Sequence, residues 1–165
     1  MDEYQLKVKQ ALASRDGEPL FNGSAAHASV ILEEMFMNAQ SSMKILSSAL
    51  NRDVYGNEKV VREFSKFLEN KAHRVEIMLD GVGEDCDLDG HPLSEVLKAE
   101  NCEVRYVPVN ERNSYDFHIA LMDDDGYRFE ADKTKHEAVI AFGHKAGSKN
   151  LGEVFAFIWG LCPKH

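Results

Sequence analysis

Residues 117–131 read FHIALMDDDGYRFEA, in which a mostly apolar run and an alternating apolar and polar run flank three aspartates and a glycine. This pattern predicts a β-hairpin with strands at 117–122 and 127–131. The Asp-Gly pair favours a type I′ turn, which requires positive φ angles at both central residues. Because side chains alternate along a strand, His118 and Ala120 are expected on one face.

The chain before the hairpin alternates between helical and strand patterns. Apolar residues at helical spacing predict a helix over 25–39, with Ser24 as its N-cap, and a second helix around Val60–Leu68. A short helix is expected to open near Pro92. Three strands separate and follow these helices, at Met43–Ser47, Val75–Leu79 and Val104–Tyr106. The α-β-α-β-α-β order implies a parallel sheet with right-handed crossovers.

The chain after the hairpin adds a strand over Glu137–Phe142 and a closing helix, with Asn150 and Glu153 as a capping-box-like start. The 165 residues suit one continuous core, and we find no linker, repeat or low-complexity segment. We therefore expect the α/β class, with one domain over 24–162 in which helices flank a mixed β-sheet. Residues 1–23 are interpreted as a polar N-terminal lead-in.

Composition and charge restrict the partners of the chain. The 28 acidic residues outnumber the 19 basic ones and give a formal charge of −9, which repels nucleic-acid phosphates and anionic membranes unless a local basic patch forms. The nearest approach to such a patch is Lys133, Lys135 and Lys145. No apolar run approaches the roughly 20 residues that span a bilayer. Three cysteines without CxxC spacing and a polar N-terminus favour a cytoplasmic protein.

The hairpin also carries a motif, because His118, Ala120 and Asp125 are spaced i, i+2 and i+7. With the element order above, this resembles one half of a protein of the phospholipase D-like superfamily, whose motif is His-x-Lys-x4-Asp. The resemblance runs from about residue 24 to residue 160 and implies catalytic roles for His118, Asp125 and Glu137. It also implies a homodimer, because the chain has one motif where the active site uses two.

Position 120, where the motif has lysine, is alanine in this chain. The family's histidine attacks phosphorus while its lysine neutralises charge on the phosphoryl oxygens. Losing one such contact typically costs about 10²–10³ in rate. Ser47, Ser48 and Asn51 follow the first strand, at the sheet edge where ligands bind in open α/β folds. Cations after the hairpin are candidates to fill the vacated position: Lys133, Lys135 and His136.

Each of these residues also has an ordinary structural interpretation. His118 lies between apolar neighbours and suits a core position, and Asp125 suits a turn. Glu137 suits a solvated strand position, the serines and Asn51 suit turns, and the two lysines suit a charged loop. Both interpretations of these residues are compatible with the sequence.

An acidic loop provides a possible metal site. Asp85, Asp87, Asp89 and Gly90 match the opening of a calcium-binding loop. The bidentate glutamate that this loop requires at its twelfth position is replaced by Val96, so we favour a solvated acidic loop. We expect neither a metal nor another cofactor.

The preferred functional hypothesis is a catalytically weakened or inactive phospholipase D-like domain. It would bind phosphate, nucleic acid or protein as a homodimer. One alternative is an active phosphodiesterase or nuclease that uses His118 from two subunits. The other is an acidic module that binds a basic protein partner, steered by the net charge of −9.

Overall fold

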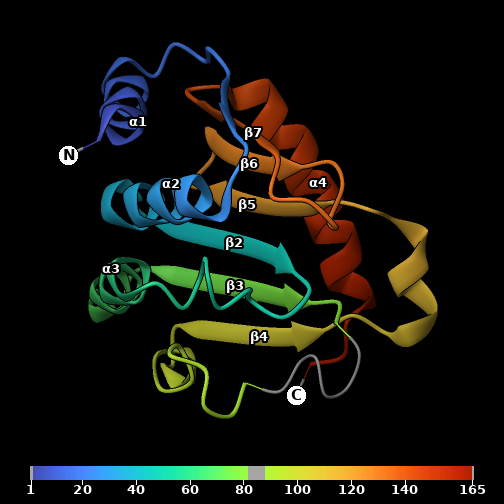
Figure 1. The fold of residues 1–165 in the computed structure, drawn as a ribbon. Coiled ribbons are helices and arrows are strands. Elements are labelled where there is room, and N and C mark those ends of the chain that lie inside the picture. Colours follow the sequence, from blue (N-terminus) through green and yellow to red (C-terminus); the bar gives the residue numbers. More distant parts are fainter. Residues whose placement is uncertain (1, 82–87, 165) are drawn as a thin grey trace.

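A computed structural model of the chain describes residues 2–81 and 88–164. These residues form one mixed sheet in the order β1-β7-β6-β5-β2-β3-β4 (Figure 1). Its strands are β1 (Leu20–Asn22), β2 (Ser42–Ser47), β3 (Arg74–Leu79), β4 (Cys102–Tyr106), β5 (His118–Met122), β6 (Gly126–Glu130) and β7 (Ala138–Phe142). Strands β2, β3 and β4 pair in parallel, and every other pairing is antiparallel. The predicted mixed α/β sheet is confirmed.

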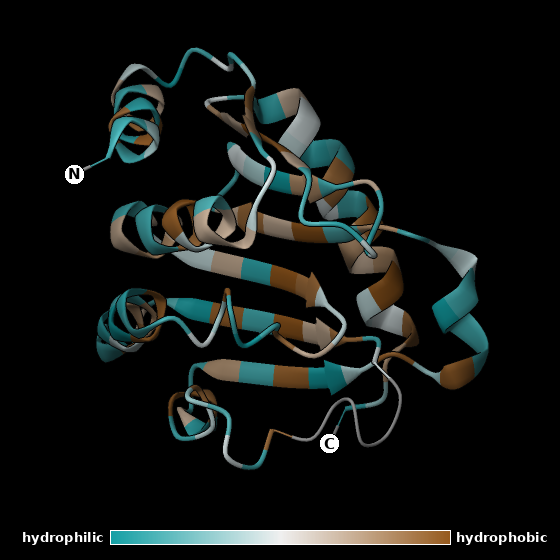
Figure 2. Ribbon diagram, in the orientation of Figure 1, coloured by the Kyte–Doolittle hydropathy of each residue, from teal (hydrophilic) through white to brown (hydrophobic). Residues whose placement is uncertain are grey.

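Helices cover both faces of this sheet (Figure 1). The helices are α1 (Glu3–Ser14), α2 (Ala25–Asn38), α3 (Glu58–Glu69) and α4 (Lys145–Leu161), with short 3₁₀ segments at Val96–Lys98 and Val109–Ser114. One buried apolar cluster joins α1, α2 and α3 to the sheet, and a second cluster joins α4 to the opposite face. Figure 2 shows the matching apolar stretches along the strands in the middle of the sheet. The sheet is therefore the central layer of three.

The N-terminal segment is more ordered than its sequence pattern indicates. Within α1, only Val8 and Leu12 are buried, so the helix lacks a long apolar stripe. Polar contacts hold it instead: the buried carboxylate of Glu34 accepts from Lys9 Nζ at 2.8 Å and from Gln5 Nε2 at 3.1 Å. Hydrophobic periodicity does not detect polar contacts of this kind.

One of the predicted helix starts is confirmed, and two are wrong. Ser24 caps α2 as expected, since its hydroxyl accepts from the backbone N–H of His27. The closing helix begins earlier than predicted, at Lys145, where His144 rather than Asn150 caps it through Nδ1. The helix expected near Pro92 is also wrong, because that segment forms turns followed by the 3₁₀ turn Val96–Lys98.

The hairpin turn differs from the predicted type I′ geometry. It spans three residues, because Met122 pairs with Gly126, and within it only Asp123 has a positive φ, of 54°. The Asp123 carboxylate accepts from the backbone N–H groups of Gln40, Ser41 and Ser42. These bonds tie the turn to the start of β2 and explain why an aspartate adopts the left-handed region. Within the described residues, every helix is too short or too polar to cross a membrane.

Candidate functional site

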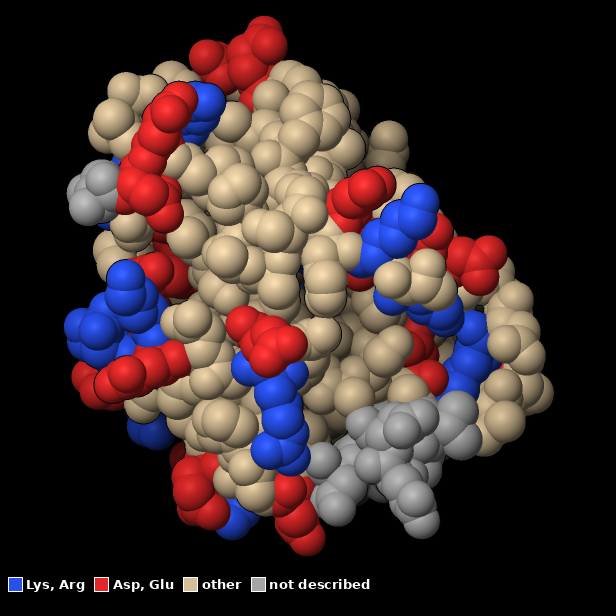
Figure 3. Space-filling view, in the orientation of Figure 1, with Lys and Arg blue, Asp and Glu red and all other residues tan. Residues whose placement is uncertain are grey.

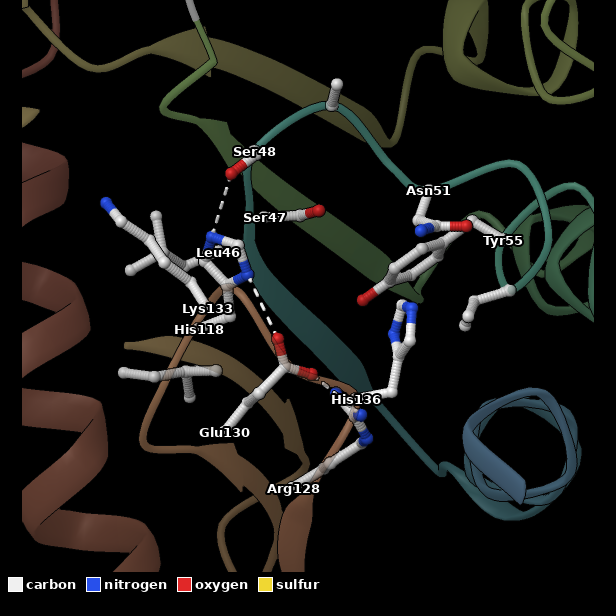
Figure 4. Close-up of a pocket in the computed structure, with 13 residues that line it drawn as sticks. Leu46, Ser47, Ser48, Asn51, Tyr55, His118, Arg128, Glu130, Lys133 and His136 are labelled. Carbon is white, nitrogen blue, oxygen red and sulfur yellow. Dashed lines mark hydrogen bonds and ion pairs between the residues drawn. The ribbon is translucent and has the colours of Figure 1, made fainter. Parts of the chain in front are cut away.

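A pocket of about 230 Å³ opens where β2 ends and β5 begins (Figure 4). The topology creates it: β5 runs antiparallel to β2, so the start of β5 lies beside the carboxyl end of β2. Six of the nine predicted site residues line it, namely Ser47, Ser48, Asn51, His118, Lys133 and His136. Tyr55, Arg128 and Glu130 complete its polar wall.

His118 lies between two carboxylates in this pocket. Its Nε2 atom is 3.6 Å from Asp80 Oδ2 and 3.1 Å from the Ser48 hydroxyl, while its Nδ1 atom is 3.4 Å from Glu130 Oε1. Asp80 follows β3 directly, and its side chain is only 1% exposed. Glu130 is the cross-strand partner of His118 in the hairpin. Both nitrogens of the ring therefore face acceptors.

This arrangement favours the imidazolium form of His118. Burial of the ring opposes protonation, but hydrogen bonds to Asp80 and Glu130 outweigh burial, and the pKa of His118 is raised. Burial likewise opposes ionisation of the two carboxyls. Their contacts with His118 and with nearby cations nevertheless hold the pKa of Asp80 and the pKa of Glu130 below their ordinary values. The arrangement thus stabilises the charged forms of all three groups, the protonated ring and the two ionised carboxylates.

Two further cations complete the cluster. Arg128 Nη2 donates to Glu130 Oε2 at 2.9 Å, and Lys133 Nζ lies 3.4 Å from Asp80 Oδ2. With His118 protonated, these five side chains carry three positive and two negative charges. In that protonation state the pocket is locally positive although the whole chain carries −9. On the face shown in Figure 3, acidic and basic side chains are intermixed around a largely uncharged centre.

Three predicted site residues lie elsewhere. Asp125 is at the far end of the hairpin from His118, where its carboxylate accepts from Arg15 Nη1 at 3.1 Å. Lys135 and Glu137 are exposed and line a separate groove beside β1. The glutamate that contacts His118 is Glu130, whereas the family resemblance suggested Glu137.

The other predicted residues at the end of β2 have structural contacts of their own. The Ser47 hydroxyl accepts from the backbone N–H of Leu50, and Asn51 Oδ1 accepts from that of Asp53. These bonds shape the loop over the pocket while leaving both side chains along its wall. The turn-former interpretation and a place at the site are therefore compatible.

The sequence interpretation missed Asp80, Arg128, Glu130 and Tyr55. Asp80 had a usable signal, because it follows a parallel strand at the same sheet edge as Ser48. Arg128 and Glu130 alternate along the second hairpin strand and share the face of Ala120 and His118. Tyr55 lies in the loop after β2 and had no local signal.

In the part of the chain that the structure describes, no group of three or more His, Cys, Asp or Glu is arranged to hold a metal ion. The acidic loop considered from the sequence is only partly covered. Asp85 and Asp87 lie outside the described residues, so the structure does not test that loop.

We compared the sequence and the structure with those of known proteins. Residues 24–165 match a family described as "Domain of unknown function (DUF7931)". Among curated proteins, none matches the sequence. Nuc from Salmonella typhimurium, a phospholipase D family member, is similar in structure with a TM-score of 0.63 at 12% identity, covering 90% of this chain and 99% of Nuc.

Two further solved structures are similar. NucT from Helicobacter pylori gives a TM-score of 0.60 at 13% identity, covering 91% of this chain and 100% of NucT. TrmBL2, an archaeal chromatin protein with a novel mode of DNA binding, gives 0.65 at 13% identity, covering 99% of this chain and 67% of TrmBL2. At these identities the likeness concerns the fold, and the fold is phospholipase D-like.

Proposed function

The chain belongs to the family described as a domain of unknown function (DUF7931), and its fold is phospholipase D-like. We propose that it binds phosphate groups without cleaving them. In this proposal His118 contributes positive charge to the pocket and does not act as a nucleophile. The pocket at the ends of β2 and β3 is the binding site.

One observation carries the proposal: carboxylates face both nitrogens of His118. A histidine attacks phosphorus through the lone pair of a neutral ring nitrogen, and an imidazolium has no such lone pair. The Asp80 carboxylate also lies beside Nε2, the nitrogen on the Ser48 side of the ring, where it holds the proton that an attacking nitrogen would have to lose. Position 120 is alanine, so the family's lysine is missing from the strand that carries His118.

The charge distribution supports a single phosphate group as the ligand. Long nucleic-acid tracts are bound by neutralising many phosphates, which requires an extended basic surface. This chain carries −9, and its described cations at the site converge on one small pocket. A terminal or isolated phosphate group suits such a pocket better than a continuous backbone.

The first test combines turnover with binding. We expect no cleavage of bis(4-nitrophenyl) phosphate above the buffer rate, and measurable binding of inorganic phosphate by calorimetry. Lys133→Gln removes a pocket cation and is expected to weaken binding about tenfold. Lys149→Gln, on exposed α4 surface, is the matched control and should bind like the wild type. Cleavage that disappears in His118→Ala would instead establish the alternative, an active phosphodiesterase.

The proposal also includes a homodimer, because a single motif supplies half of the family's two-motif site. Light scattering across a wide concentration range should give about twice the chain mass of 18.6 kDa. A strict monomer at high concentration would remove the pairing and the two-copy site. It would leave the pocket, which lies within one chain, intact.

A further inference from the structure

We infer that Arg128 and Tyr55 are the groups that bind the phosphoryl oxygens in this pocket, and that Asn22 positions Arg128 for this purpose. The inference rests on the proposed phosphate-binding function and names the residues that would carry it.

The acceptors of the pocket are occupied. Glu130 accepts from Arg128 through Oε2 and faces His118 through Oε1. Asp80 is shared between His118 and Lys133. Each of these carboxylates is paired with two cationic side chains, so its negative charge is already balanced within the wall of the pocket.

The donors are not all occupied. A guanidinium has five N–H groups, and within the described residues Arg128 donates only from Nε, to Asn22 Oδ1 at 3.1 Å, and from Nη2, to Glu130. The Tyr55 hydroxyl has no hydrogen-bond partner in the same part of the chain, and Figure 4 shows it pointing toward the middle of the pocket. A buried wall with spare donors and committed acceptors is complementary to an oxyanion.

The Tyr55 hydroxyl also remains a donor under ordinary conditions. Tyr55 is only 6% exposed, and burial raises the pKa of its hydroxyl. The nearby Arg128 guanidinium acts in the opposite direction but does not outweigh burial. The proton therefore stays on the oxygen across the neutral range.

Arg128 also compensates for the missing lysine. It is the cross-strand partner of Ala120, so its side chain projects from the same sheet face, two residue pairs along from His118 and Glu130. The cation expected at position 120 is thus supplied from the neighbouring strand. A guanidinium differs from an ammonium in its planar fork, which binds two oxygens of one phosphate at once.

Asn22 holds this guanidinium from the N-terminal segment. Its side chain is buried, accepts from Arg128 Nε and donates from Nδ2 to the backbone carbonyl of His136. Asn22 pairs with Ala138 in β7, whose small side chain lets the amide reach across toward β6. The segment before the matched family region, which begins at residue 24, therefore contributes to the site.

The experiment measures phosphate binding by Tyr55→Phe and Arg128→Lys. Tyr55→Phe removes one hydroxyl and should weaken binding of inorganic phosphate about fivefold, the factor for one neutral hydrogen bond, with an unchanged melting temperature. Arg128→Lys keeps the charge but loses the fork, and should weaken binding at least about tenfold. Tyr4→Phe is the matched control, because it also removes a tyrosine hydroxyl without a described partner, but one that borders the groove beside β1.

The outcomes separate this inference from the proposed function. Wild-type affinity in Tyr55→Phe and Arg128→Lys, with weakened binding in Lys133→Gln, would overturn the inference and keep the function. A wild-type protein that binds no phosphate would overturn both. Parallel titrations with thymidine 5′-monophosphate and dithymidine monophosphate distinguish a terminal phosphate from a phosphodiester.

The role of Asn22 is tested by a separate measurement. Asn22→Ala should weaken phosphate binding and also move the Nε–H signal of Arg128 in a ¹H–¹⁵N spectrum, because that N–H loses its acceptor. An unmoved Arg128 signal would remove Asn22 from the site whatever the stability of the variant.

Discussion

Replacing Ala120 with lysine is expected to lower the free energy of unfolding by about 3–5 kcal/mol, the cost of an unpaired buried charge. Ala120 is 1% exposed and belongs to the apolar cluster under α2 and α3. Its cross-strand partner is Arg128, so the new ammonium would lie beside a guanidinium of like charge. Urea unfolding at neutral pH measures the loss.

Two further variants separate the effect of the added charge on stability from the effect of the added side-chain volume. Ala120→Met adds similar length without charge, and should cost only the roughly 1–3 kcal/mol of overpacking. Ala120→Lys combined with Arg128→Ala makes room and leaves one cation on the face, so it should regain part of the lost stability and bind phosphate. An Ala120→Lys protein as stable as the wild type would contradict the inferred placement of Arg128.

The parts of the fold with local signals were predictable. Ser24 as a cap, the hairpin and the parallel strands β2, β3 and β4 each follow from spacing within a short window. Helix α1 was not predictable in this way, because its buried apolar surface is small and Glu34, far along the chain, holds it through polar contacts. Elements fixed by tertiary contacts leave weak patterns in the sequence.

The partners of His118 depended on the length of one turn. A two-residue type I′ turn at Asp125-Gly126 would place Lys133 opposite His118, whereas the observed three-residue turn places Glu130 there. A change of register thus converts a neighbouring cation into a neighbouring carboxylate. The sequence identified the strand that carries His118. The side chains that contact His118 could be assigned only once the pairing register of β5 and β6 was known.

Replacing Glu130 with alanine is expected to cost about 3–5 kcal/mol of unfolding free energy. The Glu130 side chain is 8% exposed and contacts both His118 and Arg128, so its removal leaves two buried cations short of a partner. Glu137→Ala is the matched control: it also removes a glutamate, but from an exposed position, and should change stability by less than about 0.5 kcal/mol. Equal stabilities of the two variants would contradict the cluster described for His118.

The same pair of variants should differ in how stability depends on pH. Because the pKa of His118 is raised from its ordinary 6.5 in the folded state, its contribution is full below pH 6.5 and is lost as pH rises through the raised pKa. The contributions of Asp80 and Glu130, whose pKa values are lowered from 3.8 and 4.5, are full above those values and are lost as pH falls through the lowered ones. The cluster therefore stabilises the wild type most between about pH 4.5 and 6.5.

Glu130→Ala removes one of the two carboxylates that raise the pKa of His118, so the decline of stability above pH 6.5 should shift to lower pH and become shallower. Glu137→Ala should retain the wild-type profile. Urea unfolding at closely spaced pH values, with an NMR titration of the His118 ring, measures both effects. A His118 that titrates at or below its ordinary pKa in the wild type would mean that the ring is neutral near pH 7, which would restore the nucleophile and overturn the binding-only site.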